Sequence, residues 1–102
     1  MAGRPETAER FQKKGEYVAR VIVGETIIVP IRGQVGDLDA IYNLNDVGSV
    51  IWEAIEGQTP VSCMVEAVCR EFDVAPEKAE ADTLAFVKRL EAAGLLEGAG
   101  AL

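Results

Sequence analysis

Three short hydrophobic runs in the first half of the chain are followed by three segments in which hydrophobic residues recur every three to four positions. The first pattern is typical of β-strands and the second of amphipathic α-helices. The sequence therefore predicts an α+β domain, winged-helix-like, in which a three-stranded antiparallel sheet precedes three helices. In the usual winged helix the strands of the wing come after the helices, so the order here is different.

The strands are expected within residues 17–44. Residues 17–29 contain two Val- and Ile-rich runs separated by Gly24, which indicates a β-hairpin. Because Pro30 has no N–H for a sheet ladder, we expect the second strand to end there or to face an open edge. After a loop with two glycines, residues 38–44 are expected to form the third strand.

The first helix is expected over residues 46–56. Asn45 is a good N-cap residue, and Gly57 can adopt the left-handed conformation that closes a helix. A second helix should begin with Thr59 as its N-cap and Pro60 at its first position.

The third helix should begin at Pro76, run to about residue 93 and close at Gly94. Hydrophobic residues and one threonine repeat along it with helical spacing. The expected buried face consists of Ala79, Thr83, Phe86, Val87 and Leu90.

The two ends of the chain lack such patterns. Residues 1–16 are polar, with Phe11 as the only large hydrophobic group before Tyr17, and the last residues are small and glycine-rich. We expect a flexible tail over residues 1–16, a folded domain over residues 17–97 and a disordered tail over residues 98–102.

Composition limits the function further. The 102 residues include 17 acidic and 10 basic ones, for a net charge of −7. Nucleic-acid binding relies on clustered Lys and Arg, so this balance argues against a nucleic-acid partner. No hydrophobic run is long enough to cross a bilayer and no secretory signal is visible, so we expect a cytoplasmic protein without a membrane partner.

The sequence offers little for catalysis. It has no histidine, no nucleophile elbow and no phosphate-binding glycine loop. Cys63 and Cys69 have neither a metal-site spacing nor a redox CxxC spacing. The sequence therefore predicts a protein that is not an enzyme and that holds no metal or other cofactor.

A peptide-binding edge remains as a candidate site. Sheet edges present unpaired N–H and C=O groups, to which an extended peptide can add as a further strand. The third strand, residues 38–44, contains no proline. Asp37 and Asp39 at its start fit either protection of the edge against aggregation or selection of a peptide.

Several segments, in this order, resemble the pyrroloquinoline quinone biosynthesis protein D family. The resemblance covers residues 17–97 and includes residues 42–45, residues 50–57, residues 59–61, residues 71–74, residues 81–90 and residues 94–96. It implies a compact domain of three strands and three helices, which is also found fused to larger enzymes as the RiPP recognition element. Such domains bind the leader of a ribosomally made precursor peptide.

The resemblance also implies where a leader would bind. In the family the leader adds to the third strand and lies in a groove beside the third helix. By position, the peptide-binding residues are expected to be Asp39, Ile41, Asn43, Asp82, Leu84, Lys88 and Arg89. Phe86, Val87 and Leu90 are assigned to the core.

The function implied is a non-catalytic peptide chaperone that presents the leader to a modifying enzyme, typically a radical S-adenosylmethionine maturase. No residue identifies pyrroloquinoline quinone as the product. Two other hypotheses stay open at this point. One is a winged-helix transcriptional regulator, and the other is a structural subunit that forms a homodimer through its free sheet edge. The chain could thus be a monomer or a homodimer.

Overall fold

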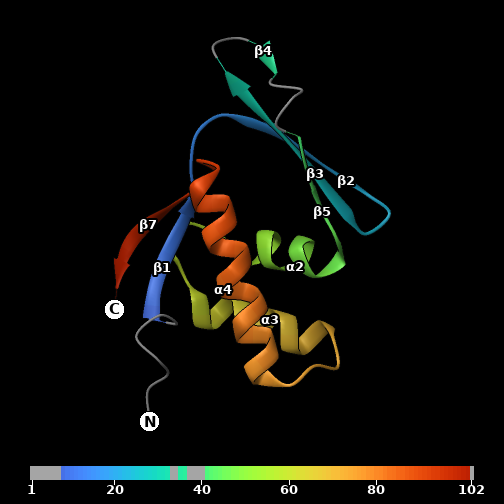
Figure 1. The fold of residues 1–102 in the computed structure, drawn as a ribbon, viewed down its shortest axis with the longest axis vertical. Helices are drawn as coiled ribbons and strands as arrows, with labels where there is room; N and C mark the ends of the chain where they lie inside the picture. The colour runs from blue at the N-terminus through green and yellow to red at the C-terminus, as the bar shows by residue number, and fades with distance from the viewer. Residues whose placement is uncertain (1–7, 33–34, 37–40, 102) are drawn as a thin grey trace.

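The computed structural model describes residues 8–32, 35–36 and 41–101. Within these residues the chain forms two antiparallel sheets and three helices (Figure 1). The predicted α+β class, with three antiparallel strands and three helices, is confirmed. A second sheet, which the sequence did not predict, is joined to this arrangement.

The larger sheet has β3 at its centre. β2 pairs antiparallel with one side of β3, and both β4 and β5 pair antiparallel with the other side. The strands are β2 (Tyr17–Ile22), β3 (Glu25–Arg32), β4 (Val35–Gly36) and β5 (Tyr42–Leu44). The predicted hairpin is therefore present. Of the expected third strand, residues 42–44 form β5, Ile41 precedes it, and residues 38–40 lie outside the described residues.

One of the two sequence-based expectations for Pro30, that the second strand ends there, is wrong. β3 continues to Arg32, because the pairing of β3 with β2 does not use a backbone N–H at Pro30. The hydrogen bond of 2.9 Å from Ile31 N–H to the carbonyl of Glu16 shows that position 31 faces β2. Groups at Pro30 therefore point to the opposite side of β3, between the residues that pair with β4 and those that pair with β5.

The turn between β2 and β3 has an unusual residue. Val23 and Gly24 both have positive φ angles, of 45° and 80°. Two such residues in a two-residue hairpin loop are typical of a type I′ turn. A β-branched residue is strained in this conformation, and Val23 is also 97% exposed.

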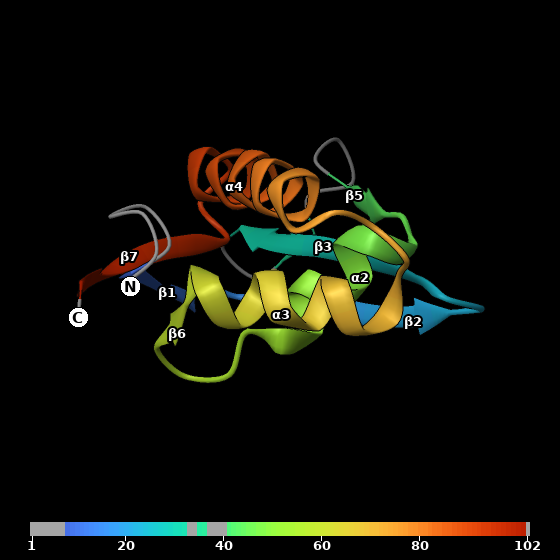
Figure 2. The ribbon, with the colours of Figure 1, turned by 90° about the horizontal axis from the view of Figure 1, so that it is seen from below.

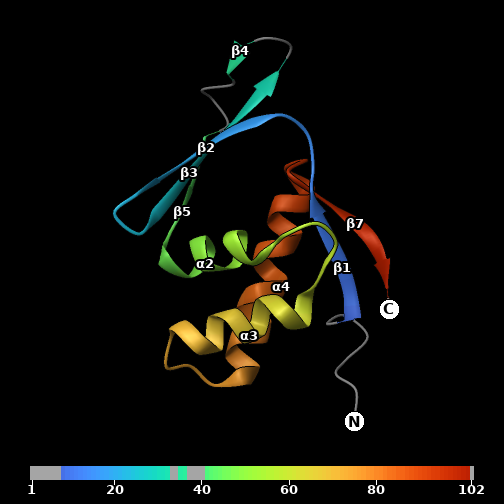
Figure 3. The same ribbon diagram turned by 180° about the vertical axis from the view of Figure 1, so that it is seen from behind.

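The smaller sheet corrects the prediction of flexible and disordered ends. β1 (Glu9–Lys13) lies between β6 (Thr59–Pro60) and β7 (Leu96–Ala101), so these parts of residues 1–16 and 98–102 are strands. Phe11 is only 5% exposed and belongs to the hydrophobic core. One buried ring and backbone pairing on both sides hold β1, although its hydrophobic pattern is weak. Figure 3 shows β1 and β7 side by side near the C-terminal end of α4.

The first helix starts as predicted. It is labelled α2 (Asp46–Ala54), and the side chain of Asn45 accepts a hydrogen bond of 2.8 Å from Gly48 N–H. It ends earlier than predicted, with Ile55 as its C-cap, and Gly57 has a positive φ of 62° in the turn that follows.

The prediction that Thr59 is the N-cap of the second helix is wrong. That helix, α3 (Val61–Glu71), begins one residue after Pro60. The hydroxyl of Thr59 instead accepts a hydrogen bond from Glu56 N–H and donates one to the Glu56 carbonyl. Thr59 thereby closes the turn after α2, and it pairs with Phe11 in the smaller sheet.

The third helix, α4 (Pro76–Ala92), has proline in its first turn and buries the predicted face. Gly94 follows it with a φ of 82°. The N–H of Leu95 donates to the carbonyl of Leu90, and the side chains of Leu95 and Leu96 are buried. The predicted glycine closure is therefore confirmed.

The core lies between the helices and the inner face of the larger sheet. Thr26, Ile28 and Leu44 on that face are at most 2% exposed. α3 contacts both α2 and α4, α2 contacts β3, and Figure 2 shows α3 and α4 in a view from below. The outward faces of β2 and its hairpin are not covered in this way, since every residue of β2 after Tyr17 is exposed.

Trp52 of α2 joins the two sheets. The ring of Tyr17 at the start of β2 meets it edge-on at 5.4 Å between centroids, and the amine of Lys13 in β1 lies 4.5 Å from its centroid. Burial lowers the pKa of Lys13 from 10.5, an effect that the nearby carboxylates of Glu53 and Glu56 oppose. The two contacts thus connect α2 to a residue on either side of the crossing from β1 to β2.

Candidate functional site

One edge of β5 has no strand partner among the described residues. On its other edge, Leu44 pairs with Thr26 and Tyr42 pairs with Ile28. The backbone groups of Thr26 and Ile28 point away from β2 and bond to Leu44 and Tyr42. Along a strand, successive residues point their backbone groups to opposite sides, so those of Asn43, between Tyr42 and Leu44, point away from β3. The N–H and C=O of Asn43 therefore point to the open edge.

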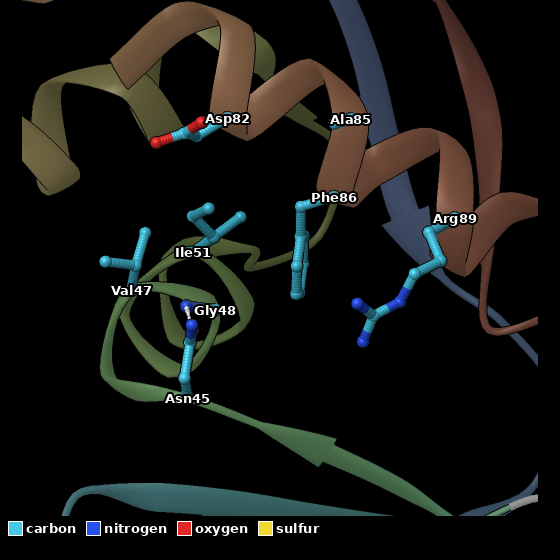
Figure 4. Close-up of a pocket in the computed structure, with 8 residues that line it drawn as sticks. All are labelled: Asn45, Val47, Gly48, Ile51, Asp82, Ala85, Phe86 and Arg89. Atoms are coloured by element: carbon cyan, nitrogen blue, oxygen red, sulfur yellow. Dashed lines mark hydrogen bonds between the residues drawn. The ribbon is translucent and has the colours of Figure 1, made fainter. Parts of the chain in front are cut away.

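A groove runs alongside this edge, between the start of α2 and α4. Its larger part has a cavity volume of about 360 Å³. A smaller hollow of about 110 Å³ shares four lining residues with it and extends to Asn43 and Leu44. Residues that line the larger part are Asn45, Val47, Gly48, Ile51, Asp82, Ala85, Phe86 and Arg89 (Figure 4).

Gly48 sets the depth of the groove. A Cβ atom at this position would lie 3.1 Å from Cε1 of Phe86 and 3.3 Å from the side-chain oxygen of Asn45. Both distances are shorter than ordinary van der Waals contact. Glycine therefore lets the ring of Phe86 approach the first turn of α2, with the Asn45 cap below it, as Figure 4 shows.

The groove has a hydrophobic middle and charged ends. Asp82 and Arg89 are seven residues apart on α4, which is about 10 Å along a helix. Phe86, with Val47 and Ile51 opposite, lies between them. An extended chain rises about 3.3 Å per residue, so roughly three peptide residues would span this distance.

Only some of the residues expected to bind a peptide line the groove. Asn43, Asp82 and Arg89 line the groove. Ile41, which comes just before β5, is 43% exposed. Asp39 lies outside the described residues.

Leu84 and Lys88 lie on the other flank of α4. Together with Glu9 and Phe11 they line a separate hollow of about 140 Å³ beside β1. The structure therefore does not bring these two residues to the edge of β5.

Sequence reasoning missed the part of the groove that α2 contributes. Val47, Gly48 and Ile51 were not among the expected binding residues, and Phe86 was assigned to the core alone. Phe86 is 9% exposed and serves both core and groove. A glycine inside an otherwise regular helix was the available signal, because such a residue often permits a close approach.

The described part of the chain contains no group of three or more His, Cys, Asp or Glu side chains that could hold a metal ion. Cys63 is exposed and Cys69 half-buried, and both are free thiols. Among the described helices, none is both long and apolar enough to cross a membrane. What the groove offers is an open backbone edge beside a hydrophobic hollow.

Residues 25–96 match the family model of coenzyme PQQ synthesis protein D, PqqD. The chain belongs to the PqqD family. The matched segment includes all of β3, β5 and the three helices, so both sides of the groove lie in the part that PqqD proteins share. A search of curated proteins found no match.

A solved structure of TbiB1 in complex with the TbiA(beta) leader peptide is similar to this chain. The TM-score is 0.70 with 26% sequence identity, over 84% of this chain and 94% of the TbiB1 chain. TbiB1 was thus seen with a leader peptide bound, on a fold that this PqqD-family chain shares over most of its length.

Proposed function

We propose that this chain is a peptide chaperone without catalytic activity, which binds the leader of a ribosomally made precursor peptide by β-strand addition. The observation that carries the proposal is the open edge of β5, whose Asn43 backbone groups face the groove beside α4. The family and the TbiB1 leader complex support the same function.

In this proposal the leader lies antiparallel to β5 and pairs with the N–H and C=O of Asn43. Each such hydrogen bond contributes on the order of 1 kcal/mol. An apolar leader side chain fills the hollow beside Phe86, where Val47 and Ile51 provide the opposite wall. Arg89 and Asp82 at the two ends then favour leaders with opposite charges at the matching positions.

The bound leader is presented to a modifying enzyme, for which we propose a radical S-adenosylmethionine maturase in the cytoplasm. Tethering the precursor raises its effective concentration at the enzyme and makes the modification effectively intramolecular. The family description favours coenzyme PQQ synthesis as one candidate pathway.

Calorimetric titration with the short peptide encoded nearest to the gene tests strand addition. Proline at each position of the leader removes one backbone N–H, and alanine at the same position is the matched control. We expect proline at a hydrogen-bonded position of the central segment to weaken binding about tenfold, with alanine having a much smaller effect except at the anchor side chain. Equal binding of all proline variants would contradict the proposal.

A further inference from the structure

Among the described residues, the larger sheet has a second edge without a strand partner, on β2. β2 is the outermost strand on its side of β3, and the β2–β3 hairpin projects beyond the helices (Figures 1 and 3). Val18, Val21 and Ile22 are 44%, 61% and 54% exposed. This edge is on the opposite side of β3 from β5, so it is separate from the groove.

The β2 edge has few of the features that usually prevent strands from pairing between molecules. Monomeric proteins protect such edges with proline, charged side chains (lysine above all), bulges or very short strands. β2 is six residues long, has neither proline nor lysine and pairs with β3 in an unbroken register. Arg20 is its only charged residue, and it forms no ion pair with another described residue.

The register with β3 fixes which backbone groups of β2 are free. The N–H of Ile31 donates to the carbonyl of Glu16, so the backbone groups of Val18, Arg20 and Ile22 also face β3. The N–H and C=O groups of Tyr17, Ala19 and Val21 therefore point outward. Three residues with free groups, centred on Ala19, form a template for an antiparallel copy of the same strand.

Two copies can pair about a two-fold axis at Ala19. In this register Ala19 faces Ala19 of the second copy, and each Tyr17 faces Val21 of the other copy, so all three outward-facing residues are hydrogen-bonded. Aromatic and β-branched side chains in direct cross-strand pairs stabilise sheets.

Backbone pairing selects this register, and the charges of the strand are compatible with it. A register centred on Val18 would place Arg20 directly opposite Glu16 of the second copy, but it would set Val21 opposite Gly15, which lies outside β2. Arg20 faces Val18 of the second copy, and its diagonal neighbours on the same face are Glu16 and Arg20 of that copy, roughly 7–8 Å away between Cα atoms. Because of the two-fold symmetry, the opposite-charge pair of Arg20 and Glu16 occurs twice in the interface. In the next register, which is centred on Arg20, two arginines would face each other directly. Glu16 and Arg20 are both exposed and available for the contact.

We propose that this chain forms a two-fold symmetric dimer through antiparallel pairing of β2 with β2 of a second copy, centred on Ala19. The two larger sheets join into one, and the two β5 edges lie at its opposite ends. Both grooves stay open, and one dimer offers two leader-binding edges. The interface is isologous, as is usual in homodimers.

Sedimentation of the full chain from about 1 µM to about 1 mM tests the dimer. We expect the mass to rise from that of one chain to that of two. In the Arg20→Glu variant, both symmetric diagonal pairs of position 20 with Glu16 have like charges. This should weaken self-association about tenfold. The double variant Glu16→Arg with Arg20→Glu restores opposite charges and should return the dissociation constant to within about threefold of the original. Arg70→Glu on α3 makes the same charge change elsewhere and should have no effect.

Ala19→Pro removes the outward N–H at the centre of the interface, and should abolish the dimer while β2 still pairs with β3. Amide spectra of each variant show whether it is folded. A chain that stays monomeric at all concentrations would overturn the proposal. A dimer that Arg20→Glu does not weaken, or that the double variant does not restore, would also overturn it. Leader binding at β5 is measured separately and does not depend on this result.

Discussion

Cε1 of Phe86 on α4 lies 3.1 Å from the point where any side chain at position 48 of α2 would place its Cβ atom. The two helices approach each other at this point because Gly48 has no side chain. The same contact forms the floor of the groove that extends to the open edge of β5. The shape of the proposed leader site therefore depends on one glycine.

Gly48→Ala should weaken leader binding about tenfold and lower the free energy of unfolding by at most about 2 kcal/mol. Alanine improves helix propensity by up to about 1 kcal/mol, while the close contact costs about 1–3 kcal/mol. Displacement of the Phe86 ring would reduce the hydrophobic hollow. Gly98→Ala on β7 is the matched control, since a Cβ there meets nothing within 4 Å. Calorimetry and urea unfolding measure the two effects, and unchanged leader affinity would show that this contact does not shape the site.

Arg89 and Lys88 are adjacent on α4 but lie on different flanks. Arg89→Ala should weaken leader binding about tenfold, because arginine at a buried interface often dominates binding energy. Lys88→Ala should change it by less than about threefold, because Lys88 lines the hollow beside β1. Fluorescence anisotropy of a labelled leader compares the pair. Equal losses, or a larger loss for Lys88, would place the leader elsewhere.

Phe11→Ala should lower the free energy of unfolding by about 3 kcal/mol, since deletion of a buried ring leaves a cavity. Phe72→Ala removes the same group from a half-buried position and should cost clearly less. Urea unfolding of both variants gives the comparison. If Phe11→Ala had no effect, residues 9–13 would behave as a tail rather than as β1.

Val23→Asn should stabilise the protein by about 1 kcal/mol. Valine is strained at a positive φ, whereas Asn followed by Gly is favoured in a type I′ turn. Little packing is lost, because Val23 is 97% exposed. Thermal unfolding should show a rise in the melting temperature of several degrees. A lower melting temperature would mean that Val23 makes a stabilising contact, contrary to its exposure.

Local signals in the sequence predicted the helices and the hairpin well. The Asn45 cap, the Gly94 closure and the buried face of α4 all depend on residues within a few positions of one another. The smaller sheet depends instead on pairing of β1 with β7, across almost the whole chain. A strand with one large hydrophobic residue, Phe11, carries too weak a pattern to reveal such a partner.

The groove was partly predictable for a similar reason. Asp82, Phe86 and Arg89 follow helical spacing along one flank of α4, while Leu84 and Lys88 follow it along the other. Spacing separates the two flanks, but only the packing of α4 against α2 decides which one meets β5. The expected set therefore combined residues from both flanks.

The most direct test of the account is an amide NMR titration of the labelled chain with the leader of the peptide encoded nearest to its gene. The account predicts the largest shifts at Asn43, Gly48 and Arg89, with slowed exchange of the Asn43 N–H as it gains a strand partner. Lys88 and the β1–β7 sheet should change little. Shifts confined to the β1 side of α4, or no shifts at high peptide excess, would contradict leader binding at the edge of β5.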